Sequence, residues 1–149
     1  MTVWVKEQLI IEIDRAILDG YRRFIFGGAL GVDTWAGEIV ADMKEGKYSH
    51  LPIILDLYSP FEGQEGNWFD ESKIRYYNLM ARCDNIVEVC DAGYAPWKMI
   101  VRDKAMVNDS DLVIAVWNGD GGKSGTGHTV TYAKKLNKPM IIVDPKGAV

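Results

Sequence analysis

The chain has 149 residues, of which 48% are hydrophobic, 26% charged and 11% aromatic. This composition excludes a disordered or low-complexity protein, and the length predicts one domain over residues 1–149 with a core of its own. The 17 basic and 21 acidic residues give a formal net charge of −4. That charge disfavours a nucleic-acid partner, because binding along a phosphate backbone needs a basic face.

Helices and strands alternate along the predicted chain. The spacing of apolar residues predicts helices over residues 2–19, 32–43, 70–82, 96–108 and 129–136. Short apolar runs predict strands over residues 23–26, 52–57, 85–89, 112–117 and 139–143. Such alternation is typical of parallel strands joined by right-handed crossovers. We therefore expect an α/β, Rossmann-like three-layer sandwich with a mostly parallel sheet of about five strands.

The N-terminal residues indicate the cellular location, and the two cysteines indicate whether a disulfide or a metal site is expected. Residues 1–15 form an amphipathic pattern without the apolar centre of a signal peptide, and no apolar run reaches the length of a membrane span. Cys83 and Cys90 are too few for a disulfide framework, and their spacing matches no metal motif. We expect a cytoplasmic protein with reduced thiols, no membrane partner, no metal and no cofactor.

Two segments, residues 24–40 and 111–135, each run from a strand through a glycine turn into a helix. In a parallel sheet such turns meet at the carboxyl edge, where ligands of open α/β folds bind. A helix start presents free N–H groups to a phosphate, and glycine lets the ligand approach closely. The first turn could also be a plain tight connection. The second holds five glycines, interleaved with Lys123, Ser124, Thr126, His128 and Thr129, which favours a ligand role there.

Known phosphate fingerprints fit these turns poorly. A P-loop needs a glycine five positions before Gly122, where Trp117 stands. The first turn, GGALGVD, is not the G-x-G-x-x-G of dinucleotide-binding proteins either. An ordinary ATPase or dehydrogenase is therefore not expected.

Three segments together carry a family resemblance: GGALGVDTWAGEIV (27–40), VRDKAMVNDSDLVIAVWNG (101–119) and SGTGHTVTYAKKLNKP (124–139). With Gln64, Trp68 and Tyr94, they resemble the YpsA-like branch of the SLOG superfamily, which also includes Smf/DprA proteins and LOG-type phosphoribohydrolases. The resemblance runs from about residue 3 to residue 144. It implies a Rossmann-like domain whose glycine turns bind a nucleotide-derived ligand, in a bacterial or phage-infected host cell.

The motifs of the family correspond to individual residues of this chain. The first motif corresponds to Gly27, Gly28, Gly31 and Asp33, the second to Gly125 and Thr126, and the helix that follows to Thr129 and Tyr132. Arg102 and Asp103 correspond to an Arg-Asn pair, with Asp in place of Asn.

Three departures from the family pattern stand beside these matches. The chain begins at the helix that follows the family's usual opening strand and Gly-His-Arg turn. Thr129 occupies the position of a glutamate of LOG-type hydrolases, and two residues, not one, separate Gly122 from Gly125.

Several candidate side chains have a structural alternative. Asp33 could accept a ribose hydroxyl or only complement a helix dipole. Arg102 could bind a phosphate or pair with Asp109 or Asp111. His128 could contact an anion or lie exposed at a helix start.

Aromatic residues supply the stacking candidates. Loop positions make Trp68 and Tyr94 candidates for stacking on a base, whereas Trp35 and Trp117 lie on apolar stripes typical of a core. The complete predicted ligand-binding set is Gly27, Gly28, Ala29, Gly31, Asp33, Trp68, Tyr94, Arg102, Asn118, Gly121, Gly122, Ser124, Gly125, Thr126, His128 and Thr129.

The sequence contains two phosphate-type glycine turns but no recognisable catalytic constellation. This combination favours a binding protein that senses or sequesters a nucleotide-derived molecule, such as ADP-ribose or a cyclic nucleotide. A role in phage counter-defence follows by analogy. The alternative is a nucleotide-directed hydrolase of the phosphoribohydrolase type, for which Asp33, Asp103 and Asp111 are eligible acids and none is singled out. A third hypothesis is a structural or partner-binding module.

The aromatic content suggests self-association. Five Trp, seven Tyr and four Phe are many for this length, and aromatic residues are enriched in interface cores. An open sheet position beside residues 23–26 would also invite pairing. We expect a homo-oligomer, first of all a two-fold dimer, with an aromatic-rich monomer core as the alternative.

Overall fold

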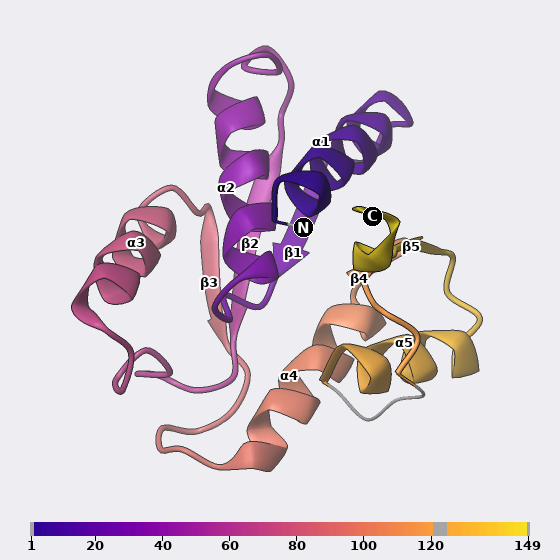
Figure 1. The fold of residues 1–149 in the computed structure, drawn as a ribbon. Helices are drawn as coiled ribbons and strands as arrows, with labels where there is room; N and C mark the ends of the chain where they lie inside the picture. Colours follow the sequence, from indigo (N-terminus) through magenta and orange to yellow (C-terminus); the bar gives the residue numbers. More distant parts are fainter. Residues whose placement is uncertain (1, 121–124, 149) are drawn as a thin grey trace.

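The computed structural model describes residues 2–120 and 125–148. Helices and strands alternate along them (Figure 1): α1 (Thr2–Leu18), β1 (Arg23–Phe26), α2 (Val32–Glu45), β2 (Ile54–Ser59), α3 (Asp70–Met80), β3 (Asn85–Glu88), α4 (Pro96–Asn108), β4 (Val113–Val116), α5 (Gly125–Lys135), β5 (Met140–Val143) and a short 3₁₀ helix (Pro145–Ala148). Every predicted helix and strand is present. The fifth helix begins at Gly125, four residues before its predicted start, so the second glycine turn runs directly into it.

The strands are parallel, which confirms the α/β, Rossmann-like class. They form two sheets, β1-β2-β3 and β4-β5, instead of the single sheet of about five strands that the sequence predicted. The division falls between β1 and β4, since β1 pairs only with β2 and β4 only with β5 within the described residues. A cavity of about 520 Å³ lies along both strands at this point.

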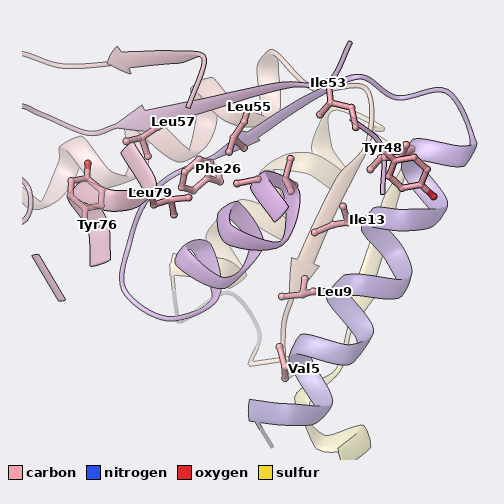
Figure 2. Packing of buried hydrophobic residues seen from close by; sticks show 13 residues of the cluster. Val5, Leu9, Ile13, Phe26, Tyr48, Ile53, Leu55, Leu57, Tyr76 and Leu79 are labelled. Atoms are coloured by element: carbon pink, nitrogen blue, oxygen red, sulfur yellow. The ribbon is translucent and has the colours of Figure 1, made fainter. Parts of the chain in front are cut away.

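The main core lies between the three-stranded sheet and the helices α1, α2 and α3. Leu55 and Leu57 of β2 lie on the same face of that strand and have no exposed surface. Figure 2 shows how Val5, Leu9 and Ile13 follow one face of α1 toward this core. The periodicity in the first helix therefore marks a buried face, as expected.

Helix α2 packs closely on β1. A Cβ at Gly37 would lie 2.7 Å from the Phe26 ring, so glycine at this position allows the helix to approach the strand. Trp35 of the same helix packs against the core, as its apolar stripe predicted. This close packing fixes the loop that joins β1 to α2, where the first glycine turn lies.

Two smaller observations complete the description. Cys83 and Cys90 are free and half-buried, and burial raises the pKa of the Cys83 thiol to about 11. Among the described residues, no helix combines the length and apolar character that a membrane span requires.

Candidate functional site

A cavity of about 460 Å³ lies at the carboxyl ends of β1 and β4. The loop after β1, one side of α4 and the first turn of α5 contribute its walls. Its volume falls in the range of small-molecule sites, roughly 300–1,000 Å³. Its polar lining residues include Asp33, Arg102, Asp103, Thr126 and Thr129.

The protein's own side chains fill the space around the first glycine turn. Gly28 has φ +71°, and a Cβ there would lie 2.5 Å from Cδ1 of the fully buried Leu57. A Cβ at Gly27 would lie 2.7 Å from Nη1 of Arg102 and 2.8 Å from Oδ2 of Asp33. Both glycines are therefore required by packing, which favours the plain-connection interpretation of these two positions.

Arg102 extends from α4 to this turn and is only 4% exposed. Its Nη1 donates to the carbonyl oxygens of Gly27 at 2.5 Å and Tyr58 at 3.3 Å, and its Nε donates to Asp103 at 2.7 Å. No hydrogen bond to a described residue is assigned to Nη2. Since no shielded side-chain nitrogen in the described part of the chain lacks a partner, Nη2 keeps some contact with solvent, and Arg102 lines the cavity.

The predicted alternative for Arg102, an ion pair with Asp109 or Asp111, is wrong. The carboxylate of Asp109 instead accepts a hydrogen bond from the Tyr58 hydroxyl at 2.6 Å. Burial and then this carboxylate raise the pKa of Tyr58 to about 12. The pairing partner of Arg102 is its sequence neighbour Asp103, which faces the same cavity.

Asp33 lies in the first turn of α2 and accepts a long hydrogen bond, 3.3 Å, from the amide of Ala29. Burial raises the pKa of this carboxyl above its usual value, with a smaller opposing effect from Arg102 and a further rise from the charge of Asp103. A carboxyl with a raised pKa beside a cation in a cavity is a common feature of functional sites.

The second glycine turn is open where the first is filled. Among the described residues, no atom lies within 4 Å of a Cβ added at Gly125, and the residue borders the cavity. The hydroxyl of Thr129 donates to the Gly125 carbonyl at 3.1 Å. The first N–H groups of a helix lack partners within it, so the start of α5 offers donors at this edge. The predicted residues Gly121, Gly122 and Ser124 lie outside the described residues.

The structure brings only part of the predicted set to the cavity. Ala29, Asp33, Arg102, Gly125, Thr126 and Thr129 line it, whereas Gly27, Gly28 and Gly31 are not among its lining residues. Asn118 and His128 are exposed and are not among its lining residues.

Neither aromatic stacking candidate lies at the cavity. Trp68 packs against the core, edge-on to Tyr76 with 5.2 Å between ring centroids. Tyr94 is 73% exposed and stands edge-on to Phe61 at 6.1 Å.

The apolar lining residues that were not predicted include Leu30, Met99 and Met106. Met99 and Met106 share one face of α4 with Arg102 and Asp103, because residues three or four apart are neighbours on a helix. That spacing in the sequence, measured from Arg102, is the signal that could have found them. They make one side of the cavity apolar beside the guanidinium.

Comparison with known proteins gives a consistent set of relatives. The YpsA model, described as the YspA SLOG family, matches residues 2–146. The chain is 32% identical over 143 residues to the uncharacterized SPbeta prophage-derived protein YoqJ of Bacillus subtilis, covering 88% of this chain and 81% of that protein. It is 30% identical over 134 residues to a UPF0398 protein of Brevibacillus brevis, covering 89% and 70%. It is also 32% identical to a UPF0398 protein of Lysinibacillus sphaericus, of which the match spans 58%.

Proposed function

The chain belongs to the YspA SLOG family, and we propose that it binds a nucleotide or nucleotide-derived small molecule in the cavity between its two glycine turns. The observation that carries this proposal is the buried Arg102, which lines a cavity that the start of α5 also borders and whose Nη2 has no hydrogen bond to a described residue. A guanidinium and a helix start are both suited to bind a phosphate, and here they border the same space.

The remaining lining residues fit the other parts of a nucleotide. Asp33 can share a hydrogen bond with a ribose hydroxyl, as acidic residues do in dinucleotide sites. Met99 and Met106 offer a polarizable apolar surface for a base, the role that the sequence had given to aromatic rings. ADP-ribose-like molecules and cyclic nucleotides contain all three parts.

Holding such a molecule without turnover would make the protein a sensor or a sequestering protein. The name of the Bacillus relative records a prophage origin. We extend that origin to this chain as part of the proposal: the protein would remove a signalling nucleotide from a bacterial defence pathway during phage infection.

The first test is a melting experiment with ADP-ribose, a cyclic nucleotide and NAD, each at millimolar concentration. A ligand at 100 times its Kd stabilises a protein by about 2.7 kcal/mol. For a chain of this size that corresponds to a rise of roughly 5–10 °C in the unfolding midpoint. If none of the three shifts the midpoint, the proposal is wrong for this ligand class.

A second candidate function is hydrolysis of an N-glycosidic or phosphate bond in the same ligand. The observation that favours it is the raised pKa of Asp33, which suits a group that donates a proton. This function predicts product from catalytic amounts of protein and its loss in Asp33→Asn. Stoichiometric recovery of unchanged ligand after hours would leave only the binding function.

We also propose that the protein is a homodimer. Large aromatic side chains on its surface support this, because Phe69 is 87% exposed and Trp97 57% exposed. Light scattering at micromolar concentration should give twice the 16.7 kDa of one chain. A mass equal to one chain would contradict it.

A further inference from the structure

Helix α4 has the reverse of the usual polarity of a surface helix. Such a helix normally turns its apolar residues toward the core and its charged residues toward solvent. In α4 the side that faces the protein buries two cations, Lys98 and Arg102. Three large apolar residues of the same helix lie outside: Trp97 is 57% exposed, Ile100 43% and Val101 39%. The outer side of α4 therefore has the composition of a face that another surface covers.

Hydrogen bonds explain why the two cations face inward. The Nζ of Lys98 donates to the carbonyl oxygens of Asp91 at 2.8 Å, Ala92 at 3.3 Å and Gly93 at 2.7 Å. These bonds use all three donors of the ammonium group. Arg102 is held in the same way by the backbone carbonyls described above. Rotating the helix to bury its outer side would remove both cations from these acceptors, so the apolar residues stay outside.

The exposed apolar residues of α4 belong to one continuous stripe. Spacings of three, four and seven residues place side chains on the same face of a helix, here over two turns or about 10 Å of its axis. We call this face the α4 stripe, and it consists of Trp97, Ile100, Val101 and Lys104. Met106 and the other α4 residues that line the ligand cavity lie on the opposite side of the helix.

The cation at the end of the α4 stripe is held in place by the neighbouring helix. Helix α5 packs along one side of α4 (Figure 1), and the Nζ of Lys104 lies 5.2 Å from the centroid of the Tyr132 ring. The Tyr132 hydroxyl donates to the Asn108 side chain at 2.7 Å, which fixes this ring against α4. The α4 stripe therefore ends in a positioned positive charge.

The α4 stripe is self-complementary. It is symmetric about the point between Ile100 and Val101, and a two-fold axis there, perpendicular to the helix, would place α4 of a second copy antiparallel on it. Ile100 then meets the partner's Val101, and Trp97 meets the partner's Lys104. The contact has an apolar centre and, at each end, a cation beside an indole ring, the aromatic ring that attracts cations most strongly. Within the stripe no two like charges face each other.

The exposed apolar residues near α3 give no comparable argument. Phe69 is 87% and Ile74 59% exposed. However, α3 has ordinary polarity, because it buries Tyr76 and Leu79 and places its charged residues outside. Single apolar residues on the outside of such a helix are normal on a protein surface. The reversed polarity of α4 therefore distinguishes its outer face from that of α3.

We propose that two copies of the chain associate through the α4 stripe, with their α4 helices antiparallel around a two-fold axis. This proposal rests on the homodimer proposed above and adds which face forms the contact. Because the ligand cavity lies on the opposite side of α4, each copy keeps its own cavity. The contact covers only two turns of each helix, so the dissociation constant should lie in about the micromolar range.

The test measures the mass of the full chain by sedimentation, without nucleotide, at about 1–100 μM. Trp97→Lys places a lysine against the partner's Lys104 at both ends of the contact. Like charges in an interface are strongly unfavourable, so we expect the dissociation constant to rise at least about tenfold. Since Trp97 is largely exposed, the variant should fold, and circular dichroism should show an unfolding midpoint close to that of the unchanged chain.

A second substitution tests the antiparallel arrangement. Adding Lys104→Glu to Trp97→Lys places each new lysine opposite a glutamate of the partner. Association should recover at low salt and be lost again in about 0.5 M NaCl, which screens exposed charge pairs. Only an arrangement that brings residue 97 next to the partner's residue 104 gives this recovery. A double variant that stays as weak as Trp97→Lys would overturn the antiparallel contact.

Phe69→Lys is the matched control, because it replaces an aromatic side chain that is even more exposed and lies outside the α4 stripe. It should leave the dissociation constant unchanged. A dimer that Phe69→Lys weakens and Trp97→Lys does not would overturn the α4 stripe and keep the homodimer. A mass of one chain for the unchanged protein at about 100 μM would contradict both. None of these measurements involves a nucleotide, so the proposed ligand is tested separately.

Discussion

Both glycine turns follow parallel strands and lead into helices, yet different atoms surround their glycines. Around Gly27 and Gly28 the space is filled by Arg102, Asp33 and Leu57 of the protein itself. Around Gly125 a side chain would enter open space beside the cavity. A glycine at a strand end therefore indicates that another group approaches the backbone closely, but it does not show whether that group is a ligand or a side chain of the protein. In the first turn it is the protein's own core.

The largest effect should come from filling the packed turn. Gly28→Val places a branched side chain at φ +71°, with its Cβ 2.5 Å from Leu57, a residue that has no exposed surface to move into. Overpacking and backbone strain each cost about 1–3 kcal/mol, so the free energy of unfolding should fall by about 2–6 kcal/mol. Urea denaturation measures this change in the free energy of unfolding.

A comparison with Gly63→Val separates overpacking from backbone strain. Gly63 has a similar φ of +84° but no atom within 4 Å of an added Cβ, so this variant tests backbone strain without overpacking. Its loss should be smaller than that of Gly28→Val by about 1–3 kcal/mol. Equal losses would mean that the first turn is no more tightly packed than an open loop.

The second prediction concerns the open turn. Gly125→Val should melt cooperatively with a midpoint close to that of the unchanged chain, because an added Cβ there meets no atom of the described residues within 4 Å. Blocking the approach of a phosphate to the N–H groups of α5 should cost about 1.5–3 kcal/mol of binding, roughly 10- to 150-fold in affinity. Isothermal titration with the ligand found in the melting screen measures this loss.

Thr131→Val is the matched control for the open turn. Thr131 lies on α5, is exposed and does not line the cavity, so the substitution places a valine on the same helix away from the site and removes only the hydrogen bond from its hydroxyl to the Gly127 carbonyl. Ligand affinity should be unchanged. If Gly125→Val also leaves affinity unchanged, the ligand does not bind at the start of α5.

A third prediction tests whether a change in the first turn alters ligand affinity through Arg102. Gly27→Ala places a Cβ 2.7 Å from Nη1, which must move and lose its 2.5 Å hydrogen bond to the Gly27 carbonyl. Hydrogen bonds that involve a charged group contribute about 1.5–3 kcal/mol, so stability and ligand affinity should both fall by up to that amount.

A double-mutant cycle shows whether this effect passes through the guanidinium. In an Arg102→Met background, Gly27→Ala has no Nη1 to displace, and its effect on affinity should largely vanish. A full effect in that background would mean that the first turn contributes to binding independently of Arg102.

The sequence predicted the elements well because each one has a local cause. Apolar spacing in α1 and the runs that form β2 and β4 depend only on neighbours in the chain. The split into two sheets could not be predicted in the same way, because pairing of β1 with β4 depends on segments almost 90 residues apart. The open position beside residues 23–26 was nevertheless expected, and within the described residues β1 has no strand partner on that side.

The candidate site was predicted less completely than the fold. Arg102 was selected for its chemistry, but its contact with Gly27 joins residues 75 positions apart and has no signature in the chain. Trp68 was assigned to ligand stacking because it lies in a loop, yet that loop folds back and packs the ring against Tyr76. Local pattern alone does not tell a loop residue that packs on the core from one that faces a ligand.

The last and smallest expected effect concerns Asp33, the side chain of the packed turn that also lines the cavity. Burial holds its pKa above the value of an unfolded chain, so the folded state binds the proton more tightly. This stabilisation is complete below the unfolded pKa and is lost as the pH rises through the folded pKa. Asp33→Asn lacks the charge, so it should unfold a few degrees higher than the unchanged chain at pH 7 and show no gain near pH 3. Asp70→Asn, an exposed carboxylate in the first turn of α3, should show no such gain at pH 7. Melting curves between pH 3 and pH 8 decide the matter: a loss of stability in Asp33→Asn at pH 7 would mean that its ionised carboxylate stabilises the packed turn.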